Sequence, residues 1–335
     1  MLRPILNEGI GPILFGFGID NSSGTPSVAE GNVDEVSDID VSTATLTITP
    51  KTPFARSPVI VSNVASLGGL GGDLIADSGK SSFLSRAQDH AGSAVLTTHQ
   101  ILVLGHSSAF TGLKRSQLVR SSNIRPRLIG TKINTTTEAS PADGCERDFS
   151  VSYASNVATV TFRNPFARPP VVIPTPNGSA CAVGNVTSVT KTGCVIKTAD
   201  SGGNLAGAGI SFLALGWDSA FARASARSLI QTSQRASRIF GLQFRGAGTQ
   251  LQTIGGESAT GANGGTGVFT LTFVKAFKRV PILVGVASAG SALLYTSIEE
   301  TVSGATVRTF NSSAAATDFD NLNVICLGFD EATEY

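Results

Sequence analysis

The sequence predicts an all-β protein built from three tandem copies of one β-sandwich or jelly-roll-like module, each of about 110 residues. Two landmarks recur in one register along the chain. The first is a strand followed by a Phe–x–basic–x–Pro corner, whose last residues Pro58, Pro170 and Pro281 are 112 and 111 residues apart. The second is an apolar closing strand ending in Gly105, Gly216 and Gly328, spaced by 111 and 112. Two landmarks that keep one register indicate copies of one fold.

The corner gives the repeat its signature: Phe54, Arg56, Pro58, Phe166, Arg168, Pro170, Phe277, Arg279 and Pro281. Because each copy is as large as a domain, we expect tandem domains and not short solenoid units. The predicted divisions are 1–110, then 111–220 beginning with a connector at 111–127, then 221–335 beginning with a connector at 221–245. These ranges are called the first, second and third units below.

Composition supports short strands over helices. Gly is abundant at 37 residues, charged residues make up 15% of the chain, and there is one Met. Long surface helices use Lys, Glu, Leu and Met, whereas strands joined by tight turns use Gly, Ser and Asn.

The second unit predicts its strands most clearly. We expect an opening strand at 125–133, alternating strands at 148–155 and 156–165, and a buried strand at 171–174. Two strands within 183–200 surround a turn near Gly193, and a closing strand covers 210–217. The Phe166 ring anchors the corner while the prolines after it prevent helix formation. The third unit repeats the plan. The first is expected to hold two additional residues between Ile48 and Phe54, and therefore a wider loop.

The four cysteines do not predict a disulfide framework. Cys145, Cys181 and Cys194 fall in the second unit, Cys326 falls in the third, and the first unit has none. A bridge essential to the fold would recur with the fold, so buried free thiols are favoured. A Cys181–Cys194 bridge is the alternative.

Charge is concentrated in the two connectors. Residues 1–110 hold 5 basic and 10 acidic residues, 128–220 hold 6 of each, and 246–335 hold 4 and 8. Each connector holds 5 basic residues and no acidic one. Two interpretations stay open: the connectors lie against acidic modules of the same chain, or they bind an external acidic protein. The near-neutral total charge and scarce aromatic residues argue against nucleic acid. The candidate partner-binding residues are Lys114, Arg115, Arg120, Arg125, Arg127, Arg223, Arg227, Arg235 and Arg238, with Arg245 at the connector's end.

Reactive chemistry finds little support in the sequence. His90, His99 and His106 lie in one unit at spacings that match no compact ligand motif, so we expect no metal site. Gly79-Lys80-Ser81 lacks the earlier glycine of a phosphate loop, and residues 67–72 lack the spaced glycines of a dinucleotide fold. Asp218 and Asp330 follow the closing strands and are expected to form turns or caps, not to do acid–base work. The sequence therefore predicts no enzyme and no cofactor.

No apolar run is long enough for a spanning helix, and the N-terminus lacks the order of a secretory signal. We expect a soluble protein, made in a cytoplasm, that binds no membrane.

A family resemblance adds to this interpretation. Val268–Phe273 with Phe277–Pro281, and Val160–Phe162 with Phe166–Pro170, resemble a β-sandwich module common in virion proteins of tailed bacteriophages. The chain is also distantly similar to H-type lectin domains, which share the strand–Phe–x–x–Pro–strand order, but the sugar-binding residues of those lectins do not map onto it. The resemblance covers nearly the whole chain, once per unit, through packing residues.

The resemblance implies a non-enzymatic structural protein of the virion. The favoured function is capsid decoration, or cement, in which the chain binds the major capsid protein or other virion proteins within a large symmetric assembly. The alternative is a tail, tail-fibre or receptor-binding protein that holds host glycan through its Gly-rich loops at 67–72, 202–209 and 261–267. The sequence leaves open whether the modules pack in a line or close into a pseudo-threefold ring.

Overall fold

Every regular element in the described part of the chain is a β-strand, which confirms the all-β class. The structure is a computed structural model. It describes residues 3–4, 12–31, 36–42, 44–55, 57–65, 70–89, 93–106, 120–121, 126–133, 149–177, 183–200, 202–217, 237–245, 250–252, 259–289 and 292–330. The predicted boundaries near 110 and 220 fall outside these ranges, so the division into domains stays a prediction.

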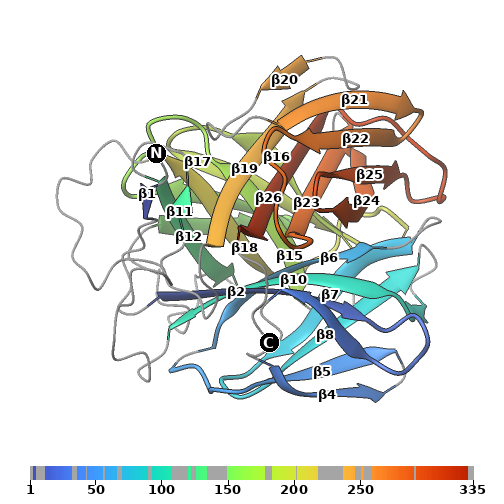
Figure 1. The fold of residues 1–335 in the computed structure, drawn as a ribbon. Coiled ribbons are helices and arrows are strands. Elements are labelled where there is room, and N and C mark those ends of the chain that lie inside the picture. Colours follow the sequence, from blue (N-terminus) through green and yellow to red (C-terminus); the bar gives the residue numbers. More distant parts are fainter. Residues whose placement is uncertain are drawn as a thin grey trace.

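Seven principal strands occupy each third of the chain (Figure 1). Those of the first unit are β2 (Pro12–Asp20), β4 (Val36–Ser42), β5 (Thr45–Pro50), β6 (Val59–Ala65), β7 (Leu70–Ser78), β8 (Phe83–Asp89) and β10 (Thr98–His106). Those of the second unit are β12 (Pro126–Ile133), β13 (Phe149–Ala154), β14 (Val157–Phe162), β15 (Val171–Asn177), β16 (Val183–Val189), β17 (Gly193–Ala199) and β18 (Gly209–Trp217). The strands predicted for the second unit are thereby confirmed.

The third unit contains β19 (Ser237–Arg245), β21 (Ala259–Gly265), β22 (Val268–Phe273), β23 (Ile282–Ala289), β24 (Ala292–Thr301), β25 (Gly304–Phe310) and β26 (Asn321–Phe329). Five short strands complete the set: β1 (Arg3–Pro4), β3 (Ser27–Gly31), β9 (Ala94–Val95), β11 (Arg120–Ser121) and β20 (Gln250–Gln252).

One pairing order recurs in all three units. The three inner strands have the order β2-β10-β6, β12-β18-β15 or β19-β26-β23. The second unit forms them as a separate sheet, whereas in the first and third units they are joined into one 14-stranded sheet through the pairings of β24 with β23 and β6. A four-stranded outer sheet has the order β4-β5-β8-β7, β13-β14-β17-β16 or β21-β22-β25-β24. The two sheets of each unit enclose an aromatic and aliphatic core of their own, as in a sandwich.

The units also share a fourth core, formed by the other faces of the inner sheets. Five equivalent positions of each unit meet there, and all fifteen side chains are buried: Leu14, Val59, Val61, Leu102 and Leu104; Leu128, Val171, Ile173, Leu213 and Leu215; Ile239, Ile282, Val284, Ile325 and Leu327. The three units are therefore packed into one body and not strung out along the chain.

Contacts between the units close into a ring. β7 of the first unit contacts β15 of the second, β16 of the second contacts β23 of the third, and β24 of the third returns to β6 of the first. Two buried hydrogen bonds cross these boundaries: the Ser62 backbone N–H donates to Thr175 Oγ1 at 3.1 Å, and Asn185 Nδ2 donates to the Ala287 carbonyl at 2.8 Å. Since each contact joins equivalent strands, the body has quasi-threefold symmetry.

The two sequence landmarks are the two halves of one contact. A Cβ atom built on Gly216 would lie 2.8 Å from Cδ1 of Phe166, and the equivalent additions at Gly105 and Gly328 would meet the rings of Phe54 and Phe277 even more closely. The glycine at the end of the closing strand thus makes room for the corner phenylalanine, which is why both keep one register.

The wider loop predicted in the first unit is wrong. β5, β14 and β22 each span six residues, and Phe54 follows β5 at the same distance as Phe166 follows β14. Pro50 occupies the place of Phe162 and Phe273, and its lack of an aromatic ring had hidden the alignment.

Substitution of Gly328 by alanine tests the landmark contact. The added methyl group would collide with the Phe277 ring in a packed core, and overpacking of this kind costs about 1–3 kcal/mol of folding free energy. Urea unfolding of Gly328→Ala should show this loss, and Gly328→Ala/Phe277→Leu should regain part of it. Gly202→Ala, in an exposed loop, is the control. Equal stability of Gly328→Ala and the wild-type protein would refute the contact.

Candidate docking surface

The repeated corners lie at one end of the sandwiches. The landmark glycines are the next-to-last residues of the closing strands, lie against the corner rings and pair with the second residues of the opening strands. They are Gly105, Gly216 and Gly328. The hairpin turns after β7, β16 and β24 come to the same place, because the backbone N–H groups of Phe54, Phe166 and Phe277 donate to the carbonyls of Lys80, Lys191 and Val302 at 2.8–2.9 Å. We call this the motif end.

The charged residues in the corner loops and hairpin turns of the motif end are all basic. Residues 51–58, 79–82, 163–170, 190–192, 274–281 and 301–303 contain nine Lys or Arg residues, three from each unit, and no Asp or Glu. They are Lys51, Arg56, Lys80, Arg163, Arg168, Lys191, Lys275, Lys278 and Arg279. Seven of these are exposed, Arg279 is half-buried and Arg56 lies outside the described residues.

The described turns at the opposite end carry the reverse charge. Residues 21–26, 96–97, 155–156, 200, 202–208, 266–267 and 311–320 contain three acidic residues, Asp200, Asp318 and Asp320, and no Lys or Arg. A difference of this kind between the two ends orients a molecule as it approaches a charged partner.

Arg127 and Arg238, predicted to bind a partner, are buried instead. They are 0% and 3% exposed, and each is the strand partner of a landmark glycine. The Arg127 guanidinium lies 4.0 Å above the Phe166 ring and donates to the Asn164 carbonyl; Arg238 lies 4.2 Å above Phe277 and donates to the Lys275 carbonyl at 3.2 Å. For these two residues the structure supports intrachain packing, so they are withdrawn from the partner-binding set.

Two further predicted connector residues belong to strands. Arg120 is in β11, which pairs with β1 and in parallel with β19, and Arg245 is the exposed last residue of β19, away from the motif end. The others lie outside the described residues: Lys114, Arg115, Arg125, Arg223, Arg227 and Arg235.

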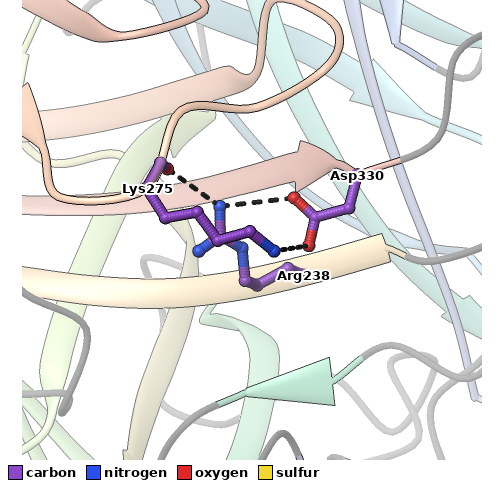
Figure 2. A network of polar contacts seen from close by, with 3 residues as sticks. All are labelled: Arg238, Lys275 and Asp330. Atoms are coloured by element: carbon purple, nitrogen blue, oxygen red, sulfur yellow. Dashed lines mark hydrogen bonds and ion pairs between the residues drawn. The ribbon is translucent and has the colours of Figure 1, made fainter.

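Asp330 holds Arg238 and Lys275 together, as Figure 2 shows. Its two carboxylate oxygens lie 3.4 Å from Arg238 Nη2 and 3.3 Å from Lys275 Nζ. Asp330 therefore fixes the end of the closing strand against the corner loop, consistent with the structural role predicted for it. Its counterpart Asp218 is outside the described residues.

The histidines do not form a site among the described residues. His99 is fully buried, with Nδ1 3.0 Å from Ser85 Oγ, while His90 and the His106 side chain are not described. The part of the chain that is described contains no group of three metal-ligating side chains. Gly79-Lys80-Ser81 forms the turn between β7 and β8, where the Gly79 N–H donates to the Ser82 carbonyl at 2.8 Å.

A third recurring position went unnoticed in the sequence. Asp89, Asp200 and Asn311 are spaced by 111 residues; Asp89 is the last residue of β8, and Asp200 and Asn311 directly follow β17 and β25. Their side chains accept hydrogen bonds at 2.8–3.0 Å from the backbone N–H four residues later, which closes the following loop. The equal spacing was the signal that identifies these loop caps.

Cys194 and Cys326 are free and buried, as predicted, and the alternative bridge from Cys181 to Cys194 is not formed. Burial raises the pKa of the Cys194 thiol to about 12. Cys145 and Cys181 are outside the described residues.

Comparisons with known proteins return no relative. No family model matches the chain, and neither a curated protein nor a solved structure resembles it significantly. Among the described residues no helix has the length and apolarity needed to cross a membrane.

The contribution of the Arg238–Asp330 pair to stability can be tested with the residues of the first unit, which has Ile13 and Ser107 at the equivalent positions. Asp330→Ser should cost roughly 1–3 kcal/mol of folding free energy, because buried Arg238 loses its carboxylate. Arg238→Ile/Asp330→Ser recreates the pair of the first unit and should cost less than the two single changes together, as measured by urea unfolding. Glu299→Ser, which breaks the partly exposed pair with Arg308, should cost under about 0.5 kcal/mol. Strict additivity would contradict the coupling.

The Cys194 thiol should resist alkylation in the folded protein. Since the thiol stays protonated at every pH well below about 12 and is buried, iodoacetamide at pH 8 should leave it unmodified until urea unfolds the chain. Peptide mass mapping measures the modification at each cysteine. Modification of Cys194 at the same rate in the folded and unfolded protein would show that the side chain is not enclosed.

Proposed function

We propose that this chain is a non-enzymatic structural protein of a phage virion that decorates the head shell, with its motif end bound to an acidic surface of the major capsid protein or a neighbouring shell protein. The observation that carries the proposal is the gathering of eight described basic residues in corner loops and hairpin turns that contain no Asp or Glu, at one end of a closed quasi-threefold body; Asp330, beside these loops, pairs with Lys275 and Arg238. The virion setting comes from the resemblance of the repeated corner to modules of tailed-phage virion proteins.

The ring arrangement favours end-on binding. All three corner loops lie at the same end of their sandwiches, so three basic patches face one way around one axis. Exposed ion pairs are worth only about 0.2–1 kcal/mol each, but a partner that meets three patches at once gains from all of them. Binding of this kind weakens with salt, and the basic loops of the motif end orient the chain toward an acidic surface.

An acidic protein suits this surface better than nucleic acid does. The aromatic residues of the corner loops, Phe54, Phe166 and Phe277, are 1–4% exposed and occupied by core contacts. Single-stranded nucleic acids are held by exposed rings on which bases stack, and the described corner loops offer none.

The second candidate is a tail or receptor-binding protein that holds glycan. Its Gly-rich loops would be the binding elements, and the described segments 202–208 and 261–267 lie away from the motif end and contain no aromatic residue for stacking on sugar rings. Shell decoration is therefore the better-supported function.

Charge reversal at the motif end tests the proposal. Lys51→Glu/Lys80→Glu replaces two exposed cations of the first unit and should weaken binding to particles stripped of the protein by about tenfold. Co-sedimentation at several salt concentrations measures occupancy and its salt dependence. Lys197→Glu/Arg245→Glu makes the same change in charge away from this end and should bind normally. Undiminished binding of the first variant, or an equal loss in both, would refute docking through the motif end.

A further inference from the structure

The three corners differ in one concerted respect. Each unit exposes two equivalent side chains at its tip: the residue just after β5, β14 or β22, and the turn residue whose carbonyl accepts the hydrogen bond of the corner phenylalanine. In the first two units these tip residues are basic, but in the third both are valine. The six are Lys51 and Lys80, Arg163 and Lys191, and Val274 and Val302.

Backbone contacts establish that the tips are equivalent. Phe166 and Phe277 donate to the carbonyls of residues 191 and 302, and Phe162 and Phe273 donate to those of 192 and 303, all at 2.8–2.9 Å. Val274 and Val302 therefore flank the same pair of hydrogen bonds that Arg163 and Lys191 flank in the second unit. The change to valine is a change of side chains on an unchanged backbone.

The side chains of the two valines are exposed to solvent, although the fold does not require an apolar residue at either position. Val274 is 67% exposed and Val302 39%, and they are two of four large hydrophobic side chains exposed in the described residues. The other two, Leu96 and Leu205, precede β10 and β18 at the opposite end. Two exposed cations follow Val274 along the loop: Lys275, which also pairs with Asp330, and Lys278. The third tip is thus an apolar pair with a basic rim.

We infer that the third tip is an apolar anchor, and that the acidic protein bound by the motif end presents two acidic patches and one apolar pocket with an acidic rim. This inference rests on the proposed function and adds the chemistry and rotational setting of the partner. The charge complementarity of the rim identifies the occupant as the same acidic protein that meets the basic tips.

Unequal tips select one of three rotations of the ring. In the matching setting the valines leave water and the cations meet carboxylates. A turn of the ring by one unit puts a lysine pair against the apolar pocket, where burial of charge is costly, and leaves an acidic patch facing valine. A chain with three identical tips would bind in all three rotations equally.

The decisive variant is Val274→Lys/Val302→Lys, which makes all three tips basic. If charge alone governed docking, two added cations would tighten binding to an acidic partner. An apolar anchor predicts the opposite sign, a loss of about tenfold or more in affinity for the stripped particle. Val274→Ile/Val302→Ile, which keeps the tip apolar, should bind as the wild-type protein does. Leu205→Lys, an exposed apolar-to-cation change at the other end, is the matched control and should also bind normally.

The outcomes separate this inference from the proposed function. Tighter binding of the lysine variant, together with loss of binding in Lys51→Glu/Lys80→Glu, would overturn the anchor while keeping basic-end docking. Loss of binding in both variants supports both. Valine-dependent binding to phosphatidylglycerol vesicles, or valine-dependent self-association in sedimentation, would overturn the inference by assigning the tip to a lipid surface or to a second copy. Thermal unfolding at an unchanged temperature shows that the variants fold.

Discussion

The rest of the structure depends on the aliphatic core that the three inner sheets share. Each inner sheet is apolar on both faces, because one face packs on its own outer sheet and the other meets the two neighbouring inner sheets. This is why the strands read as nearly continuous apolar runs, a pattern typical of sheets covered on both sides. A unit separated from the others would expose five large aliphatic side chains, and burial of each is worth about 1.5–3 kcal/mol. Each sandwich has a core of its own, but the second apolar face of its inner strands is buried only by the neighbouring units of the closed ring.

Closure of the ring also determines where charge accumulates. The contacts between units are of one kind, from a strand of the outer sheet to the inner strand of the next unit, and they close after three steps. Equivalent ends must therefore face the same direction. Three modest patches, which separate domains on flexible linkers would present independently, become one basic surface. Two arginines of similar sequence context, Arg127 and Arg238, are excluded from that surface because their guanidinium groups stack on corner rings.

The sequence was sufficient for the all-β class and the second unit's strands, because alternation and the 111–112 residue spacing are local signals. It could not show that Gly216 makes room for Phe166, since that contact joins residues 50 positions apart, yet the common register of the two landmarks was its trace. The burial of Arg127 and Arg238 was missed because basic connectors were treated as segments and not residue by residue. Their separation of 111 places them at one position of the fold, opposite the landmark glycines. Ring closure was not predictable from the sequence. A period-two pattern shows that one face of a strand is apolar, but it does not show which other sheet that face packs against.

The differences among the units carry as much information as their likeness. Where the units must pack in the same way, they keep the corner phenylalanines and the glycines, and the five core positions stay Val, Leu or Ile. Where they differ, residues that lie together differ together. The first unit replaces Arg238 and Asp330 by Ile13 and Ser107, and the third replaces two basic tip residues by Val274 and Val302. If only Arg238 or only Asp330 were replaced, the other would keep its charge within the fold without its partner. If only one of Val274 and Val302 were valine, the docking surface would place a charge next to an apolar side chain. Three identical chains in a homotrimer could not diverge in this way, because every change would appear three times. Fusion into one chain keeps the stability of a symmetric body while allowing an asymmetric face. The paired change to valine at the third tip is such an asymmetry, and it lies on the exposed surface.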